Sequence, residues 1–486
     1  FKQKTAYEIR LSLVGSEMCI RDRSITGGTL RIKNNNVYIP GQGSNSFLLK
    51  NGALLVSEGD DIGIQMAQFE TQTFETNSTT TYAKGGNQTL ANCNYGNLNL
   101  IGGGIKTATI LRTQGNMLTA STVKLFIPAS FLHTIGGNFT HNGVLSFTGA
   151  TLTRLAVSGN FISSSTTAVV DMSKNSLAHE LRLLGTTNPN INSIIGVNAI
   201  VDYASTTNQT FGKAAPAFPT LRISGGSIKT PSADIDVSST YSMVSGILNL
   251  GNFNLIIGSV AGISGTPSTT NLVLTTGTGS ITKRFSNVSP QVVNFMFPIG
   301  GRDLVNTGQF VDNRLTMNTT LTGPLTKSLS ARVVEGIHPN IIGLNGEPAV
   351  KYWATSSANI TLFNGSITGR YGSNEISTYS FQYYGAAWYN GTWDITNGRF
   401  GGINEVTKFL PSVPNINGTL TAAQPGSVAR ALTVGLPIPS TLCQGQTFTV
   451  PVTTTGAAFS TGNQFRVVAF NTISVITNTG IVATLT

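Results

Sequence analysis

Cysteine is almost absent from this sequence. The 486 residues include three, Cys19, Cys93 and Cys443, and the last two are 350 positions apart. None lies in a Cys-x-x-Cys motif or in a Cys/His cluster. The composition therefore supports neither a disulfide framework nor a cysteine-based metal site.

Charge is also scarce, since Asp, Glu, Lys and Arg make up 10% of the chain. The net charge is +10, but the basic residues are scattered singly among Thr, Ser, Asn and Gly. A nucleic-acid-binding protein would gather its basic residues in a stripe or on a helix, often among stacking aromatics. We therefore predict no nucleic-acid partner, and at most a weak attraction to acidic polymers.

Long apolar runs and helical periodicity are lacking as well. No stretch approaches the roughly 18 apolar residues of a membrane helix, and none shows a clear 3.6-residue apolar period over ten positions. The segment SLAHELRLLG, beginning at position 176, comes closest, yet its second half fits a strand equally well. The sequence predicts no membrane span in this fragment.

The opening segment reads differently from the remainder. Residues 2–23 are KQKTAYEIRLSLVGSEMCIRDR, with charges throughout and no apolar run, so they are not a secretory signal. A short amphipathic helix is one interpretation. The segment more closely resembles a translated DNA-sequencing adapter, because KQKTAYEI and LVGSEMCIRD match two constant adapter parts and the bases between them fit a sample index. We exclude residues 1–23 from functional argument, and we expect the natural amino terminus and any signal peptide to be missing through truncation.

Residues 24–282 repeat one pattern of short strands and turns. A few alternating apolar residues are followed by Gly or Asn, as in GNLNLIGGG at 96 and PTLRISGGSIKT at 219. Alternation marks strands with one buried face, and Gly or Asn supplies the turns. The pattern predicts a β-solenoid resembling a parallel β-helix, with roughly 20–25 residues per coil and about ten to thirteen coils. A string of small β-sandwiches is the alternative.

The sequence pattern changes near residue 283, where the predicted strands become longer. All three tryptophans lie in this part, and aromatics on longer alternating strands predict a two-sheet β-sandwich over 283–436. Pro411, Pro414 and Pro425 indicate a stretch poor in strands. Residues 437–486 look like the first strands of an Ig-like β-module that is cut short. The predicted fold class is thus all-β throughout.

Several segments of this second half resemble a known family. They are FMFPIGG, VVEGIHPNI, VKYWATSSANITLF, YNGTWDI and, near the end, LCQGQTFTVPVTTTGAAFSTGNQFRV. In this order they resemble β-domains and Ig-like modules of very large, repeat-rich secreted surface proteins of Bacteroidota. The resemblance implies export across the outer membrane, by the type IX route, and an adhesin-like or matrix role outside the cell. It also implies a carboxy-terminal sorting domain, which we expect to follow residue 486.

The functional prediction is a non-catalytic structural or adhesin-like protein that binds glycans or another cell surface through an extended β-surface. No cofactor and no metal site are predicted. The alternative is a carbohydrate-active enzyme, a polysaccharide lyase or hydrolase, built on the solenoid. Such enzymes need clustered carboxylates, for which Asp234 with Asp236, and Asp60 with Asp61, are weak candidates. Asp234 and Asp236 would share one strand face, although a polar outer face explains them as simply.

The aromatic run YYGAAWYNGTWD offers candidate glycan contacts. These candidates are Tyr383, Tyr384, Trp388, Tyr389 and Trp393. Aromatic rings on adjacent strands stack well on sugars. A hairpin turning at Asn390 and Gly391 would instead place Tyr389 and Trp393 in core or cross-strand packing.

Histidine and glycine motifs give no catalytic signal. His133 and His141 are eight positions apart without a nearby acid or Cys, so no metal site is predicted there. His338 precedes Pro339 and Asn340, which indicates a turn. The segment IGGGIK at 101 lacks the Ser or Thr of a phosphate-binding loop and is interpreted as a turn.

Overall fold

The computed structural model is built almost entirely of β-strands. It describes residues 22–33, 46–59, 69–128, 132–304, 308–341, 349–372, 375, 385–394, 398–401, 404–423, 431–434, 452–455, 464–465 and 483–484. In these ranges the only helical segment is the 3-10 turn η1 (Lys174–Ser176), and no helix could cross a membrane. The predicted all-β fold class is confirmed.

The chain divides into two compact units. Unit 1 comprises residues 1–159 and 163–171, and unit 2 comprises residues 160–162 and 172–486. The predicted solenoid region, 24–282, extends over both units.

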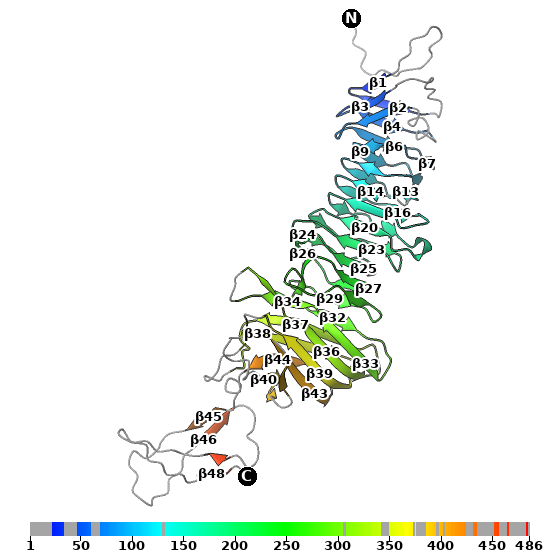
Figure 1. Cartoon of the computed structure of the whole chain (residues 1–486). Coiled ribbons are helices and arrows are strands. Elements are labelled where there is room, and N and C mark those ends of the chain that lie inside the picture. Colours follow the sequence, from blue (N-terminus) through cyan, green and yellow to red (C-terminus); the bar gives the residue numbers. More distant parts are fainter. Residues whose placement is uncertain are drawn as a thin grey trace, which may run out of the picture. The chain divides into compact units, whose positions relative to one another are not determined.

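Unit 1 is a stack of coils whose strands form three parallel sheets (Figure 1). Sheet 1a contains, in two hydrogen-bonded groups, β1 (Asp22–Ile25), β3 (Ser46–Leu49) and β5 (Thr71–Phe74), then β8 (Asn94–Tyr95), β11 (Arg112–Thr113), β14 (Leu132–Ile135) and β17 (Arg154–Val157). Sheet 1b contains β2 (Thr29–Ile32), β4 (Leu54–Ser57), β6 (Thr79–Tyr82), β9 (Asn97–Leu100), β12 (Met117–Thr119) and β15 (Phe139–His141). Sheet 1c contains β7 (Gln88–Thr89), β10 (Gly104–Thr107), β13 (Val123–Ile127), β16 (Val144–Phe147) and β19 (Val169–Asp171).

Strands of neighbouring coils pair in parallel and in register. Asn94 lies opposite Arg112, 18 positions on, and Leu255 in unit 2 lies opposite Ile281, 26 positions on. These are the extremes of the spacing between paired positions, which brackets the predicted coil length. The described strands make about 12 turns, so the predicted solenoid is confirmed and the string of small sandwiches is not observed.

The interior of the coils is filled by ladders of apolar side chains. In sheet 1b, Leu98, Met117 and Phe139 face one another in successive coils and are at most 2% exposed. Each fully buried side chain of this kind contributes roughly 1.5–3 kcal/mol. A single coil cannot enclose such a side chain, so stability depends on stacking against neighbouring coils.

Asparagines satisfy the backbone at one corner of the stack. Asn97 Oδ1 accepts a hydrogen bond from the backbone N–H of Asn116, and Asn116 Oδ1 accepts one from Asn138, both at 2.8 Å. A corner amide would otherwise lack a partner, because the strands turn away from each other there. Glycine is needed nearby for close approach, since a Cβ on Gly136 would lie 2.3 Å from the carbonyl oxygen of Gln114.

Unit 2 begins with parallel coils and ends in antiparallel strands (Figure 1). Sheet 2a runs in the order β20 (Glu180–Leu183), β23 (Ile200–Tyr203), β25 (Phe218–Ile223), β27 (Ile235–Met243), β29 (Leu255–Ile257), β32 (Ile281–Arg284), β37 (Ser328–Glu335), β38 (Lys351–Ala358), β44 (Gly418–Ala423), β40 (Gly385–Tyr389) and β41 (Trp393–Asp394), with β30 (Gly262–Ser264) also paired to β27. Sheet 2b contains β21 (Thr187–Asn188), β24 (Gln209–Phe211), β26 (Ile228–Pro231), β28 (Gly246–Asn249), β31 (Asn271–Leu274), β34 (Ile299–Arg302) and β35 (Phe310–Asp312). Sheet 2c contains β33 (Gln291–Phe297), β36 (Leu315–Thr322), β39 (Leu362–Arg370), β43 (Glu405–Val413) and β42 (Gly398–Gly401). Further short strands are β18 (Phe161–Ile162), β22 (Ile194–Ile195), β45 (Ala431–Val434), β46 (Val452–Thr455), β47 (Gln464–Phe465) and β48 (Ala483–Thr484).

The change from solenoid to sandwich takes place within one sheet. β32 pairs in parallel with β29 of the last coil and antiparallel with β37. The predicted boundary between residues 282 and 283 falls inside this strand. The solenoid sheet therefore continues into the sandwich without a linker, and an experiment on residues 283–436 alone would cut β32.

Sheets 2a and 2c face each other across a core that includes Trp353. This residue of β38 is fully buried, and a Cβ added to Gly369 of β39 would lie 2.6 Å from its ring. The ring also meets Tyr371 edge-on, with 4.7 Å between ring centroids. The longer strands predicted here are present, since β36, β37 and β38 have eight residues each and β39 has nine.

The prediction of few strands around Pro411 is wrong. Pro411 lies within β43, beyond the part of that strand that pairs with β42, so its missing N–H costs no bond on that side. The pairing of β43 with β39 shifts register between Phe363 and Gly365, opposite this stretch. A bulge is where proline is tolerated inside a sheet.

Little of the predicted Ig-like module lies within the described residues. Of residues 437–486, the structure describes β46, β47 and β48 alone. The Ig-like assignment otherwise lies outside the described residues, as does most of segment 1–23.

Candidate functional site

Three of the predicted aromatic residues, Trp388, Tyr389 and Trp393, lie on the hairpin of β40 and β41. Tyr389 pairs with Trp393 across this hairpin, and Gly391 turns it with a φ of 109°. Trp388 is 4% exposed, so its ring packs inside the domain. Tyr383 and Tyr384 lie outside the described residues.

Tyr389 and Trp393 surround His338, which the sequence indicates only as a turn. The His338 ring lies 5.2 Å from that of Tyr389 and 4.9 Å from that of Trp393, between centroids. Asn340 holds both aromatic residues: its carbonyl accepts the Trp393 indole N–H at 2.9 Å, and its side-chain amide donates to the Tyr389 hydroxyl. The Tyr352 ring lies 4.7 Å from that of His338, between centroids. We call these five residues the His338 cluster. The rings of Tyr389 and Trp393 are half-buried, and their polar atoms are occupied within it.

The predicted carboxylates Asp234 and Asp236 have structural partners. Asp234 Oδ1 accepts the backbone N–H of Asn254 at 2.8 Å, which continues the corner pattern of the asparagines. Asp236 pairs with Arg284 at 3.2 Å. Asp60 and Asp61 lie outside the described residues. Across the described ranges, no three His, Cys, Asp or Glu side chains are grouped as a metal site would require.

A different set of charges converges on the outer side of sheet 2a. Asp202 lies 3.8 Å from Arg182 and accepts the Ser224 hydroxyl at 2.7 Å, and Glu180 lies 3.3 Å from Arg222. Burial raises the pKa of Asp202, while the bond from Ser224 and the charge of Arg222 lower it. We call these five residues the Asp202 cluster. The sequence gives no signal for it, because its members come from three coils about 20 positions apart.

Lysines inside the solenoid bind carbonyl groups of the neighbouring coil. Lys106 donates to the carbonyls of Lys84 and Gly86 at 2.8 and 3.0 Å and to Gln88 Oε1 at 2.7 Å. Lys229 in unit 2 likewise bonds the carbonyl of Ser205 at 2.6 Å. Each ammonium therefore replaces missing backbone donors at a corner.

Lys106 and Lys229 lie in two similar segments, and the repeat is visible in the sequence. NQT at 87 precedes GGGIKT at 102, and NQT at 208 precedes GGSIKT at 225. In both, the Gln lies opposite the Lys of the next coil. Gly102 and Gly103 form the predicted turn, with positive φ, but β10 begins at Gly104 and directs Lys106 inward. Burial lowers the pKa of Lys106 and Lys229 to about 8.

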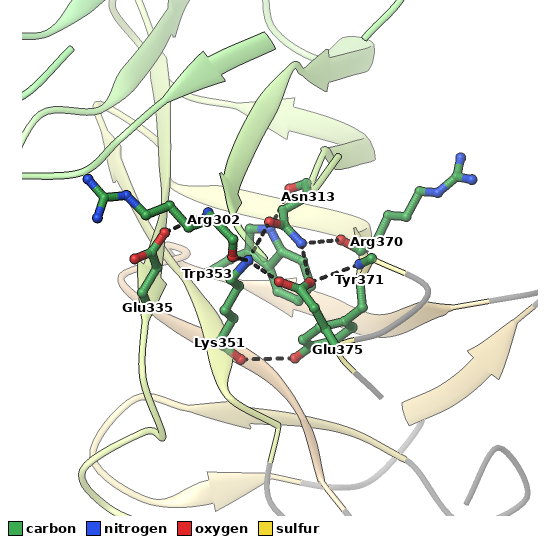
Figure 2. A network of polar contacts seen from close by, with 9 residues as sticks. Arg302, Asn313, Glu335, Lys351, Trp353, Arg370, Tyr371 and Glu375 are labelled. Atoms are coloured by element: carbon green, nitrogen blue, oxygen red, sulfur yellow. Dashed lines mark hydrogen bonds and ion pairs between the residues drawn. The ribbon is translucent and has the colours of Figure 1, made fainter. Parts of the chain in front are cut away.

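A compact group of buried polar side chains lies inside the sandwich (Figure 2). Lys351 begins β38, Asn313 lies between β35 and β36, and Glu375 follows β39. Lys351 Nζ bonds Glu375 Oε1 and donates to Asn313 Oδ1 at 3.1 Å. Asn313 Nδ2 donates to Glu375 Oε2 at 2.7 Å, so the three side chains form a closed ring of contacts. All three are buried.

Two aromatic side chains enclose this ring of contacts. The Trp353 indole N–H donates to the carbonyl of Asn313 at 2.8 Å, and the Tyr371 hydroxyl donates to the carbonyl of Lys351 at 3.1 Å. Lys351 Nζ also donates to the carbonyl of Arg302. A buried ion pair is held in place only when its remaining polar atoms are satisfied in this way. We call Asn313, Lys351 and Glu375 the sandwich triad.

No family model, curated protein or solved structure matches this chain. Function is therefore inferred from the geometry of these groups.

Proposed function

We propose that this chain is a non-catalytic structural or adhesin-like part of a protein outside the cell, which binds glycans or another cell surface. The observation that carries the proposal is the in-register stacking of exposed hydroxyl groups. On sheet 2b, Thr187, Thr210 and Thr230 lie opposite one another in three successive coils. Thr187 and Thr210 are exposed, and Thr230 is half-buried.

Such a ladder suits a polymer or a regular surface. Neighbouring parallel strands repeat at about 4.8 Å, so hydroxyl groups recur at fixed intervals along the stack. A ligand with repeated polar groups gains many weak contacts from such a surface without needing a deep pocket. The sparse charge and cysteine of the sequence, and its resemblance to large secreted surface proteins of Bacteroidota, also support a place outside the cell.

The polar groups at the corners of the coils support a structural role as well. Lys106 and Lys229 bond to corners of the coil stack, and Asp234 continues a corner ladder. These residues stabilise the stack, which is the requirement of a long β-surface.

Binding can be tested with the full chain and insoluble polysaccharides, by measuring the fraction of protein retained. Replacing Thr187 and Thr210 by lysine is expected to raise the dissociation constant about tenfold, or ~1.4 kcal/mol, because bulk and charge interrupt the ladder. The matched control replaces Thr266 and Thr269, which are exposed but not stacked. Equal retention of the two variants would contradict the role of the ladder.

Tryptophan emission recorded in the same experiment separates two binding surfaces. All three tryptophans lie at positions 353, 388 and 393. Suppose that the protein is retained on the polysaccharide and its tryptophan emission changes. If the emission change is absent in Trp393→Phe, the glycan is bound at the His338 cluster. Retention without such a change would place it on the solenoid.

The Asp202 cluster favours a second candidate, a carbohydrate-active enzyme on the solenoid. Glycosidic cleavage requires carboxyl groups in different environments, and the pKa of buried Asp202 is raised. Two arginines beside them suit an anionic polysaccharide.

Incubating the chain with uronic-acid polysaccharides and assaying new reducing ends tests this candidate. Under the first proposal, no cleavage is expected. If cleavage occurs, Asp202→Asn and Glu180→Gln should each reduce its rate about a hundredfold or more. Asp236→Asn is the matched control, because Asp236 also pairs with an arginine but lies outside the cluster.

A further inference from the structure

The side chains of the sandwich triad form an ion pair, and they are also placed so that an amine and an amide could react with each other. A primary amine, Lys351 Nζ, lies 3.1 Å from the side-chain carbonyl oxygen of Asn313. One carboxyl group, that of Glu375, contacts both partners: Oε1 bonds the amine and Oε2 accepts the amide N–H at 2.7 Å. Figure 2 shows the three side chains pointing toward one another.

We propose that Lys351 and Asn313 join in an intramolecular isopeptide bond, with Glu375 relaying the protons. The inference goes beyond the proposed function and does not depend on it. The site is a covalent modification site within the chain, and it requires no cofactor, oxidant or second protein.

The reaction balances with the atoms of these three side chains. The neutral amine of Lys351 attacks Cγ of Asn313 and forms a C–N bond. Glu375 accepts a proton from this nitrogen and returns one to the departing Nδ2, so the C–Nδ2 bond breaks and ammonia leaves. The product is a secondary amide between Lys351 and Asn313, with Glu375 in its original protonation state.

Burial makes each step easier. Lys351 Nζ bonds Glu375 Oε1 directly, so one proton moved along this contact supplies the neutral amine and the carboxylic acid that the reaction needs. Holding amine and amide in contact replaces a bimolecular encounter by an effectively unimolecular step. Trp353 and Tyr371, both buried, keep water from competing for the carbonyl carbon.

Another buried lysine supplies an internal comparison. Lys106 Nζ lies 2.7 Å from Gln88 Oε1, an amine–amide contact similar to that of Lys351 and Asn313. Lys106 Nζ also donates to the carbonyls of Lys84 and Gly86, and these hydrogen-bond partners include no carboxyl group. Without a proton relay, we expect Lys106 and Gln88 to remain unmodified.

The bond would connect the two sheets of the sandwich. Lys351 belongs to β38 of sheet 2a, and Asn313 precedes β36 of sheet 2c. Force applied along the chain would pass through this bond and bypass residues 314–350. A covalent connection of this kind suits a domain that must stay folded while it is pulled.

The decisive experiment is the intact mass of the purified full chain, followed by a tryptic peptide map. The expected mass is lower than that of the sequence by one ammonia. The map should contain one branched peptide that joins the segments of Asn313 and Lys351, with no cleavage after Lys351. Hydroxylamine treatment excludes a succinimide at an Asn-Gly pair, which also loses ammonia but is cleaved by this reagent.

Variants test the role of Glu375. In Glu375→Gln the bond should form about a hundredfold more slowly or not at all, and Asn313→Ala should retain the full mass. Tryptophan emission shows whether each variant is folded. A folded wild-type chain with the full, unmodified mass would overturn the inference, and full cross-linking in Glu375→Gln would overturn the relay. Cross-linking of Lys106 to Gln88 at equal yield would also overturn the relay.

Discussion

Replacing Trp353 by alanine is expected to lower the free energy of unfolding of the sandwich by about 3–5 kcal/mol. The ring is fully buried between sheets 2a and 2c, in contact with Tyr371 and Gly369. Its removal leaves a cavity that the paired strands cannot close, and it leaves the carbonyl of Asn313 without its 2.8 Å donor. Denaturant unfolding followed by the emission of Trp388 and Trp393 measures the change, because both remaining tryptophans lie in the same part of the chain.

Trp353→Phe is the matched control for this variant. Phenylalanine fills most of the space but has no N–H for Asn313, so the expected loss is about 1–3 kcal/mol. A loss below about 1 kcal/mol for Trp353→Ala would show that the sheets do not close on this residue. The intact mass of each variant should be determined with the unfolding curve, since a cross-link at the sandwich triad would stabilise the folded state independently.

Acidification is expected to destabilise unit 1 by about 3 kcal/mol between pH 7 and pH 4, through His141. Burial lowers the pKa of His141 from 6.5 to about 4, although its bond to the carbonyl of Val169 raises it in part. Thr119 Oγ1 lies 2.9 Å from Nδ1, and the carbonyl of Val169 lies 3.0 Å from Nε2, which suits the neutral ring with its proton on Nε2.

Acid lowers the stability of unit 1 because the folded and unfolded states bind different numbers of protons at His141. Between pH 6.5 and 4, the unfolded chain binds a proton at His141 that the folded chain does not, so falling pH favours unfolding. Above pH 6.5 neither state binds the proton, and the contribution of His141 to stability is fully present.

Denaturant unfolding at a series of pH values measures this loss of stability. Far-ultraviolet circular dichroism is the suitable signal, because unit 1 contains no tryptophan. In His141→Gln, the stability of unit 1 should lose most of its pH dependence between pH 7 and 4. His338→Gln is the control, since His338 belongs to unit 2. An unchanged slope in His141→Gln would refute the assignment to this ring.

The sites differ in how far local sequence reveals them. The hairpin at Asn390 and Gly391 follows from a turn pair between apolar residues, and it is present in the structure. His338 is predicted as a turn residue, and its carbonyl does accept the N–H of Ile341 at 3.0 Å. Its ring contacts with Tyr389 of β40 and Trp393 of β41 join residues more than 50 positions apart, and no local pattern predicts them.

The buried lysines are a second feature that the local sequence does not predict. In a strand of alternating residues, a lysine normally faces solvent because burial of its charge is unfavourable. Lys106 and Lys229 face inward because corner carbonyls of the adjacent coil accept hydrogen bonds from them. The repeated GGxIKT segments mark these positions in the sequence, but their meaning depends on the stacked neighbour.

The sequence alone predicts the all-β class and the approximate coil length, and it favours a solenoid over a string of small sandwiches. Period-two alternation and Gly or Asn at corners are local requirements of each coil, so they are visible without knowledge of contacts. The sandwich triad, the Asp202 cluster and the lowered pKa of His141 arise only in the folded chain. Lys351 lies 38 positions from Asn313 and 24 from Glu375, and Asp202 meets Arg182 only because coils stack in register. The chemistry of such groups arises from shared burial and mutual distance, which the folded chain alone sets.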